Sequence, residues 1–217
     1  MENLNKYVEH TLLKQDATKQ ELITLLDEAV KYDFLGICVN PVNVAFAKKH
    51  LGDSKVKIVT VVGFPLGASR PEAKAYEAKL AIEDGADEVD MVLNVSLMKD
   101  KEFQAVQADV EAVKKACGDK KLKVILETDL LTTEEIENAC KLCVNAKADF
   151  VKTSTGFVKN GVGAKVEDVE LMYKTVSPFG LEVKASAGIR DKEAAIKMIK
   201  AGASRLGTSA GVEIVKN

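Results

Sequence analysis

The sequence predicts one closed barrel of eight parallel β-strands, each followed by a helix, over residues 1–217. Short β-type runs alternate with amphipathic helical stretches from end to end, and this alternation predicts a parallel sheet covered by helices. Eight such units in 217 residues, with no Pro/Gly/Ser-rich linker between them, fit a compact (β/α)₈ barrel. A doubly wound open sheet is the structural alternative, but no G-x-G-x-x-G opens the chain as in a dinucleotide-binding fold.

The predicted elements follow one another in a regular order. The strands are expected at Tyr7–Thr11, Leu35–Val39, Lys57–Val62, Glu88–Leu93, Leu122–Glu127, Asp149–Thr153, Leu181–Ser186 and Ser204–Thr208. The helices are expected at Lys19–Lys31, Pro41–His50, Pro71–Glu83, Lys101–Cys117, Thr133–Asn145, Val166–Thr175 and Lys192–Ala201. Thr132 or Thr133 can cap the helix that follows it. Gly85 and Gly202 stand just past helices, where a glycine ends a helix before the next strand, and Lys147 takes this place without glycine.

Composition points away from nucleic-acid and membrane partners. The 31 Lys and Arg residues nearly balance the 33 Asp and Glu residues, so a net charge of −2 implies no polyanion-binding surface. No stretch approaches the roughly 20 apolar residues of a membrane span. The N-terminal segment MENLNKYVEHTLLK lacks the apolar core of a signal peptide. We therefore expect a cytoplasmic protein with a large hydrophobic core in a single domain.

Two of the four cysteines, Cys140 and Cys143, form a C-x-x-C motif that could serve metal or redox chemistry. They lie in a predicted helix, where Ile136, Ala139, Cys140 and Cys143 follow the apolar i, i+3, i+4, i+7 pattern. No second pair of candidate ligands lies nearby. We therefore interpret both thiols as core residues, with metal binding as the alternative.

Two lysines in matched contexts carry the strongest functional signal. Lys152 and Lys184 each follow a short apolar strand and precede small hydroxyl residues and a glycine. Lysine is rarely fully buried, and an unpaired buried charge is costly. Two such amines that point from adjacent strand ends into one cavity are expected to depress each other's pKa, which an amine nucleophile needs near neutral pH. The pair therefore favours covalent chemistry by a lysine amine.

Carboxylates occupy similar positions on two other strands. Asp90 and Glu127 each follow an apolar residue that faces the helices, as Lys152 and Lys184 do, and are expected to face the barrel interior. Neighbouring strands lie about 4.8 Å apart, so the lysines can approach each other and Asp90 can reach both, directly or through a water. A buried ion network that only satisfies itself is the alternative. Replacing such a network with apolar residues often leaves the stability of the protein unchanged, so stability alone does not explain it. Charges at the carboxyl ends of barrel strands therefore favour a function.

Three loops of small residues follow predicted strands and are suited to bind phosphate. Small residues let backbone N–H groups approach an anion. In barrels the phosphate site commonly forms from the last two βα loops, here those after Ser186 and Thr208. Arg190 either assists there or pairs with a helix carboxylate. The candidate phosphate-binding residues are Thr155, Gly156, Gly188, Arg190, Gly207 and Ser209.

Longer motifs around these residues extend along nearly the whole chain. They are EHTLLK at 9–14, GICVNP at 36–41, VGFPLG at 62–67, GADEVDMV at 85–92, KVILET at 123–128, and the segments 150–157, 183–190 and 205–212. With these motifs the chain resembles the deoxyribose-phosphate aldolases, which are class I, Schiff-base aldolases. The hexapeptide VKTSTG at 151–156 is highly specific to that family.

The resemblance implies a role for each charged residue. Lys152 would form the Schiff base, Lys184 would perturb it, and Asp90 would relay protons. The implied reaction is the reversible cleavage of 2-deoxy-D-ribose 5-phosphate to D-glyceraldehyde 3-phosphate and acetaldehyde, in deoxyribonucleotide catabolism. It needs no cofactor and no metal ion, because the iminium acts as the electron sink. A homodimer is the assembly expected from the family.

Three further residues are expected at the sugar pocket: Thr11, Cys38 and Thr153. Cys38 fits an inert core thiol equally well. The chain departs from the family pattern at Glu9, where the family usually has Asp, and at Ala187, where it usually has Gly. The first change is expected to affect a contact to a substrate hydroxyl, and the second to narrow the phosphate loop slightly.

Two other classes of function fit the same fold. A sugar-phosphate isomerase or epimerase would share the barrel and the phosphate loops, but would use carboxylates, histidine or a metal without an imine. A catalytically silent barrel would bind a sugar phosphate as a sensor. The paired lysines argue against the first, and the retention of three buried charges argues against the second.

Overall fold

Eight parallel strands close into a barrel in the order β1 to β8 in a computed structural model that describes residues 3–216. The strands are β1 (Val8–Leu12), β2 (Gly36–Val39), β3 (Lys57–Val62), β4 (Glu88–Val92), β5 (Lys121–Ile125), β6 (Phe150–Lys152), β7 (Glu182–Ser186) and β8 (Ala203–Thr208). Each strand pairs with the next, and β8 pairs with β1 to close the sheet. The predicted (β/α)₈ barrel is confirmed, with strand ends within two residues of those expected, and the open sheet is excluded.

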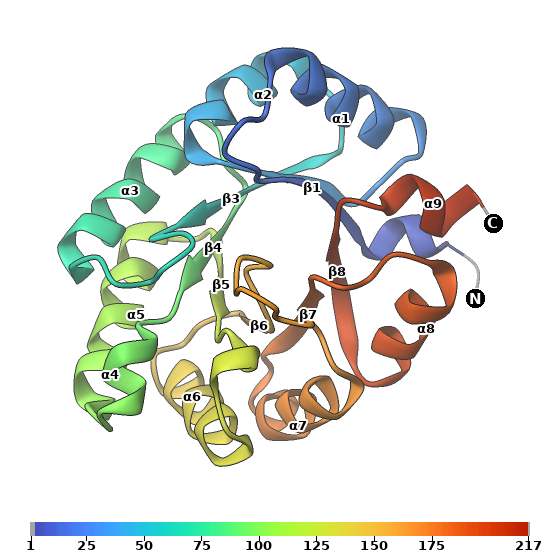
Figure 1. The fold of residues 1–217 in the computed structure, drawn as a ribbon. Helices are drawn as coiled ribbons and strands as arrows, with labels where there is room; N and C mark the ends of the chain where they lie inside the picture. The colour runs from blue at the N-terminus through green and yellow to red at the C-terminus, as the bar shows by residue number, and fades with distance from the viewer. Residues whose placement is uncertain (1–2, 217) are drawn as a thin grey trace.

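A ring of helices surrounds the strands (Figure 1). The helices are α1 (Lys19–Lys31), α2 (Val44–Leu51), α3 (Pro71–Glu83), α4 (Val95–Lys99), α5 (Phe103–Cys117), α6 (Thr133–Asn145), α7 (Val166–Val176), α8 (Lys192–Lys200) and α9 (Gly211–Lys216). Short 3₁₀ turns lie at Leu4–Tyr7, Pro41–Asn43, Thr128–Leu130 and Ser177–Phe179. The bounds predicted for α1, α3 and α6 are confirmed. The sequence reasoning missed α4 and α9, and Lys101, with φ of +60°, interrupts the helix expected from that residue.

The residues that begin and end the helices act as their types predict. The Thr132 hydroxyl accepts a hydrogen bond from the backbone of Glu135, whose carboxylate accepts one from the backbone of Thr132 in return. Gly85 and Gly202 have φ of +108° and +113°, beyond the reach of most residues, and they follow α3 and α8. Lys147 adopts a φ of +58° without being glycine. The predicted helix ends are therefore confirmed at these positions.

The core lies between the strands and the helices. Cys140 and Cys143 are fully buried on the inner face of α6, among the apolar side chains of that layer. Burial raises the pKa of the Cys143 thiol to about 12, so it keeps its proton. The interpretation of this pair as core residues is confirmed. None of the helices within residues 3–216 is long and apolar enough to cross a membrane.

The inside of the barrel has an apolar part and a charged part. Cys38 on β2 and Val59 and Val61 on β3 form a small apolar cluster with Leu13. The inward positions of β1 and of β4 to β8 instead carry buried charges. These charged residues are Glu9, Glu88, Asp90, Lys123, Lys152, Lys184 and Arg205. The candidate site lies in this charged part.

Candidate active site

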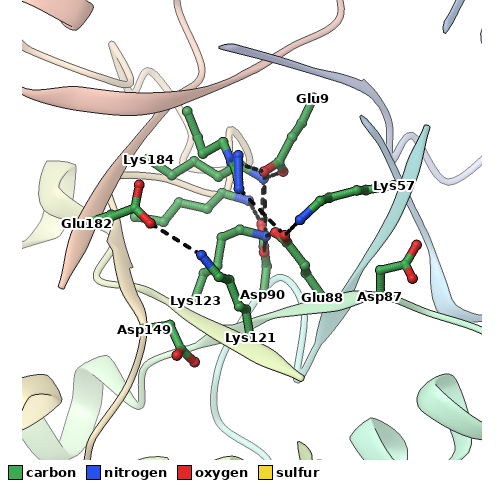
Figure 2. A network of polar contacts seen from close by, with 12 residues as sticks. Glu9, Lys57, Asp87, Glu88, Asp90, Lys121, Lys123, Asp149, Glu182 and Lys184 are labelled. Carbon is green, nitrogen blue, oxygen red and sulfur yellow. Dashed lines mark hydrogen bonds and ion pairs between the residues drawn. The ribbon is translucent and has the colours of Figure 1, made fainter. Parts of the chain in front are cut away.

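Asp90 is the centre of the charged cluster. Lys152 Nζ and Lys184 Nζ both donate to its Oδ2 atom, at 2.9 and 2.7 Å. Lys123 Nζ donates to its Oδ1 atom at 2.9 Å. Lys184 also donates to Glu9. Figure 2 shows Asp90, Lys123 and Lys184 converging from different strands. The structure thus brings Asp90, Lys152 and Lys184 into direct contact.

Strand register explains why these residues meet. Lys152 on β6 is the direct partner of Lys184 on β7, and Asp90 on β4 is the direct partner of Lys123 on β5. Side chains of paired positions in a sheet point to the same face. Two lysines therefore lie side by side on β6 and β7, and an aspartate and a lysine lie side by side on β4 and β5. All three lysine amines contact Asp90.

The carboxylates determine the charge states of the cluster. Burial alone would raise the pKa of Asp90, but the three surrounding ammonium groups outweigh burial and hold that pKa well below its usual range. Burial alone would lower the pKa of Lys184, but Asp90 and Glu9 outweigh it and raise that pKa. The expectation that each lysine depresses the pKa of the other is therefore wrong for Lys184, because two carboxylates contact it. Lys184 remains an ammonium group.

A cavity of about 390 Å³ opens above this cluster at the carboxyl ends of the strands. Lys152 is 3% exposed and lines the cavity, whereas Lys123 and Lys184 are 0% exposed and lie beneath it. Eight of the predicted site residues line it: Thr11, Lys152, Thr155, Gly156, Gly188, Arg190, Gly207 and Ser209. The amine that the sequence singled out is thus the one that a ligand in this cavity can reach.

Two positions at the cavity require glycine, because neighbouring atoms lie too close to leave room for a side chain. A Cβ atom on Gly207 would lie 2.3 Å from Ser186 Oγ and 3.0 Å from Lys184 Cε, so a side chain there would displace the lysine. Gly188 has a φ of +77°, and a Cβ atom on it would lie 2.5 Å from the carbonyl oxygen of Val162. Ala187 adopts a φ of +67°, which costs a non-glycine residue about 1–2 kcal/mol. A glycine at this position would adopt the same backbone conformation without that cost.

Thr153 and Cys38 lie outside the cavity lining. The Thr153 hydroxyl donates to the Ser186 carbonyl and accepts from the Ser186 N–H, both at 3.0 Å, and so joins the ends of β6 and β7. Cys38 is 0% exposed, and burial raises the pKa of its thiol despite the nearby lysines. Its surroundings fit an inert thiol. Thr11 lines the cavity and donates to the Glu9 carbonyl at 2.9 Å.

Glu127 does not join the cluster around Asp90. Strand β5 ends at Ile125, and Glu127 has a φ of +61° in the turn that follows. Its carboxylate accepts hydrogen bonds from the backbone N–H of Thr155, at 3.0 Å, and from the Thr155 hydroxyl. The expectation that Glu127 faces the interior like the other charges is therefore wrong. It holds the loop after β6, and Lys123 supplies the interior charge on β5.

Several residues of the cluster were missed from the sequence. Glu88 lies two residues before Asp90 on the same strand, so the alternation of strand side chains places both inside. Alignment of β4 with β5 would have placed Lys123 opposite Asp90. Ser154 and Ser186, two residues after the lysines, line the cavity with buried hydroxyls that lack a hydrogen-bond partner among residues 3–216. Substrate hydroxyls can satisfy them.

The loop from β6 to α7 lies over the mouth of the barrel, as Figure 1 shows. Asp129 Oδ2 accepts a hydrogen bond from the Gly163 N–H at 2.8 Å, and Asp129 also pairs with Lys165 at 3.6 Å. The rings of Phe157 in this loop and of Phe64 after β3 meet edge to face, with centroids 5.1 Å apart. The loop is thus held on both sides of the cavity. No group of three or more His, Cys, Asp or Glu side chains within residues 3–216 is arranged to hold a metal ion.

A parallel barrel with a lysine amine at the carboxyl ends of its strands, beside glycine-rich loops, defines a class of barrel enzymes that act on carbonyl compounds. The comparisons specify the class further. Residues 4–217 match the model of the DeoC/LacD family aldolases. The chain belongs to the DeoC/LacD aldolase family.

Named relatives are similar over most of their length. The deoxyribose-phosphate aldolase of Brevibacillus brevis is 57% identical over 98% of this chain and 95% of its own length. That of Streptococcus equi subsp. zooepidemicus is 54% identical over 99% and 96%. The tetrameric deoxyribose phosphate aldolase structure from Aeropyrum pernix superposes with a TM-score of 0.90 at 33% identity, over 97% of this chain and 88% of that one.

Proposed function

We propose that this aldolase cleaves 2-deoxy-D-ribose 5-phosphate reversibly to D-glyceraldehyde 3-phosphate and acetaldehyde, through a Schiff base on Lys152. The observation that carries the proposal is the position of Lys152. Its amine contacts Asp90 and lines the cavity, while the other two lysines on Asp90 are sealed beneath it. The names of the relatives, at 53–57% identity, support deoxyribose 5-phosphate as the substrate.

Each step uses groups that the cavity provides. The uncharged amine of Lys152 attacks the aldehyde carbon C1 of the open-chain sugar, and loss of water gives an iminium. The C3 hydroxyl then gives up its proton, the C2–C3 bond breaks, and its electron pair forms an enamine while C3 becomes the aldehyde of the product. Protonation of the enamine at C2 and hydrolysis of the imine release acetaldehyde. Asp90, through a water and beside the ammonium of Lys184, moves these protons.

The phosphate group is proposed to bind the loops after β6, β7 and β8. Gly156, Gly188 and Gly207 present backbone without side chains there, and Arg190 is an exposed cation at the same cavity. The Thr208 hydroxyl donates to the Ile189 carbonyl at 2.7 Å and thereby joins two of these loops. With the phosphate dianion bound at this rim, the aldehyde carbon of the open-chain sugar would lie near Lys152.

Three further proposals concern the domain, the cellular compartment and the assembly of the protein. We propose that residues 1–217 act as one catalytic domain, as the closed barrel suggests, and that the protein works in the reducing cytoplasm, where its four free and buried cysteines are stable. A homodimer is proposed as the assembly. Tyr76 and Leu80, one turn apart on α3 and 62% and 43% exposed, offer an apolar surface for it. Light scattering on the purified protein measures its mass.

Borohydride trapping tests the chemistry. The protein is incubated with acetaldehyde or deoxyribose 5-phosphate, reduced, and analysed by intact and peptide mass spectrometry. We expect a reduced adduct on Lys152 that is absent from Lys152→Ala, with kcat lowered about 10⁶-fold, the scale of removing a covalent nucleophile. An adduct on Lys184 would reverse the roles of the two lysines. No adduct on folded protein would favour an imine-free isomerase or a binding protein.

A further inference from the structure

The segment 158–164 of the loop after β6 lies directly on the loop after β7. The Ala164 N–H donates to the Ala187 carbonyl at 3.1 Å. A Cβ atom on Gly163 would lie 2.6 Å from the carbonyl carbon and oxygen of Ala187, and a Cβ atom on Gly188 would meet a backbone carbonyl of the same segment. The two loops therefore touch through their backbones, and a shift of the first would move the second.

The loop after β7 depends on such support. Ala187 has a φ of +67°, and a residue with a side chain keeps this conformation only where its surroundings hold it. Ala164 and Gly163 provide a hydrogen bond and close packing to Ala187. Ala187 and Gly188 line the cavity above Lys152 and belong to the proposed phosphate site. The segment 158–164 thus sets the shape of a loop that faces the phosphate group.

Asp129, in the turn after β5, anchors this segment from its other side. Its Oδ2 atom accepts a hydrogen bond from the N–H of the buried Gly163 at 2.8 Å, and its Oδ1 atom lies 3.6 Å from Lys165 Nζ. The Asp129 side chain is itself only 9% exposed. A Cβ atom on Gly161 would lie 2.8 Å from Asp129 Oδ2, so the segment bends closely around the carboxylate.

Asp129 is not placed to bind the ligand itself. It lines a smaller cavity of about 130 Å³ beside the main one, and it is absent from the lining of the cavity above Lys152. A carboxylate also repels a phosphate dianion, so attraction of the substrate does not explain its position. Any effect of Asp129 on a ligand in the main cavity must therefore act through the loops.

We propose that Asp129 is a positioning residue for phosphate recognition. By accepting the hydrogen bond of Gly163 it holds the segment 158–164 against Ala187, and the loop after β7 is thereby ordered before the phosphate group arrives. This inference rests on the proposed phosphate site. The amine of Lys152 is held by Asp90 and not by this loop, so Asp129 is expected to affect phosphate affinity and KM without affecting kcat. A contact that only stabilises the fold is the alternative.

Three measurements on each purified protein test this role. Isothermal titration calorimetry gives the Kd of inorganic phosphate, which probes the phosphate site without any reaction. Steady-state kinetics give KM and kcat for 2-deoxy-D-ribose 5-phosphate. The rate at which acetaldehyde and borohydride label Lys152, read by peptide mass spectrometry, reports the amine independently of phosphate.

Two variants of Asp129 separate the hydrogen bond from the charge. In Asp129→Ala the Gly163 N–H loses its acceptor and the loops must be ordered on binding, so the Kd of phosphate and KM rise about tenfold. The value of kcat and the labelling of Lys152 stay at wild-type values. Asp129→Asn keeps an oxygen that can accept the hydrogen bond and removes a charge that repels phosphate, so it binds phosphate at least as tightly as the wild type.

Asp87→Ala is the matched control. Asp87 Oδ2 also accepts a hydrogen bond from a backbone N–H, that of Ile58, at 2.9 Å. This contact joins the beginnings of β3 and β4, at the end of the barrel opposite the cavity. Asp87→Ala therefore loses a contact of the same kind and keeps the phosphate affinity of the wild type.

Gly161→Ala reaches the same hydrogen bond by another route. The added Cβ atom would lie 2.8 Å from Asp129 Oδ2 and would push the carboxylate away from Gly163. Gly161 is exposed, so the substitution leaves the core intact. Its Kd for phosphate should rise as in Asp129→Ala, and it decides the matter alone if circular dichroism shows that Asp129→Ala does not fold.

The outcomes separate this inference from the proposed chemistry. Unchanged phosphate affinity in Asp129→Ala or Gly161→Ala, or an equal loss in Asp129→Asn or Asp87→Ala, would overturn the role of Asp129. So would labelling of Lys152 that slows in step with the weaker binding, which indicates general disruption. A wild type without an adduct on Lys152, with the expected phosphate affinities, would overturn the Schiff base and leave this inference standing. A wild type that binds no phosphate would overturn the phosphate site and this inference together.

Discussion

Within residues 3–216, two groups of buried lysines and carboxylates differ in how many lysines share one carboxylate and in their access to a ligand. Between α3 and α5, Lys74 Nζ donates to Asp109 Oδ2 at 2.6 Å and to the Val92 carbonyl at 3.0 Å. One cation meets one anion there, and both side chains are sealed from solvent. Inside the barrel, Asp90 is shared by three lysine amines, and one of them, on Lys152, reaches a cavity.

The comparison shows that burial of a lysine is not by itself a sign of catalysis. Lys74 is as deeply buried as Lys184, yet its pair is balanced and closed, which suits a contact that holds two helices and the end of β4. The cluster at Asp90 gathers three lysines on one carboxylate and opens to a ligand at Lys152. These two properties together distinguish chemistry from packing, and mutations in the two groups should have different consequences.

Apart from loss of the nucleophile itself, the largest effect is expected for Asp90→Asn. Removal of the carboxylate takes away the base that moves protons, so kcat should fall about 10²- to 10⁴-fold. Lys152 loses its anionic partner and stays an available nucleophile, so borohydride should still trap an adduct on it. A strongly lowered kcat with a normal yield of the adduct would indicate that Asp90 acts in proton transfer. Loss of the adduct as well would mean that Asp90 is needed to form the imine.

The matching change in the closed pair is Lys74→Met. It leaves Asp109 buried without its cation, so the free energy of unfolding should fall by about 3–5 kcal/mol, while kcat/KM stays within a few-fold of the wild type. Urea unfolding and steady-state kinetics measure the two quantities.

The double variant Lys74→Met/Asp109→Leu is the control for this prediction. Replacement of both partners by apolar residues should recover most of the lost stability. A drop in kcat/KM beyond tenfold in Lys74→Met, with unfolding unchanged, would contradict the division between the two groups.

The smallest effect is a difference in acid stability. Burial acts to raise the pKa of Glu88, but Lys123 and Lys57 outweigh it and lower that pKa to about 2, from 4.5 in an unfolded chain. Its contribution, about 3 kcal/mol, is therefore complete above pH 4.5 and is lost as pH falls toward 2. Burial raises the pKa of Asp109, so its contribution has the opposite sign and grows as pH falls.

Unfolding midpoints across the acidic range test both signs at once. Glu88→Gln should flatten the loss of stability in acid, because the group that takes up a proton on unfolding is gone. Asp109→Asn should steepen it, because a compensating carboxyl is gone. Parallel curves for the two variants would show that other carboxylates dominate the acid response.

Much of this architecture could be predicted from the sequence, because it rests on local signals. The apolar period of the strands and the residues at helix ends define the barrel and most of its helices. Lys152 and Lys184 stand out because a similar local pattern surrounds both. The role of Glu127 could not be predicted, since it depends on the strand ending two residues earlier. Glu88 could have been found from the alternation of side chains along β4, whereas the partners Lys123 and Arg205 required strand register, which local pattern does not contain.

The order in which the chain is made has a consequence for this cluster. Asp90 meets Lys123, Lys152 and Lys184 at sequence separations of 33, 62 and 94 residues, and Glu9 meets Lys184 at a separation of 175. A nascent chain therefore acquires the carboxylates of β1 and β4 well before most of their counterions. Until β7 and β8 emerge and close the sheet, Glu9 has no lysine from β7 and must remain hydrated. The complete cluster around Asp90 therefore assembles only when the barrel closes, late in synthesis of the chain.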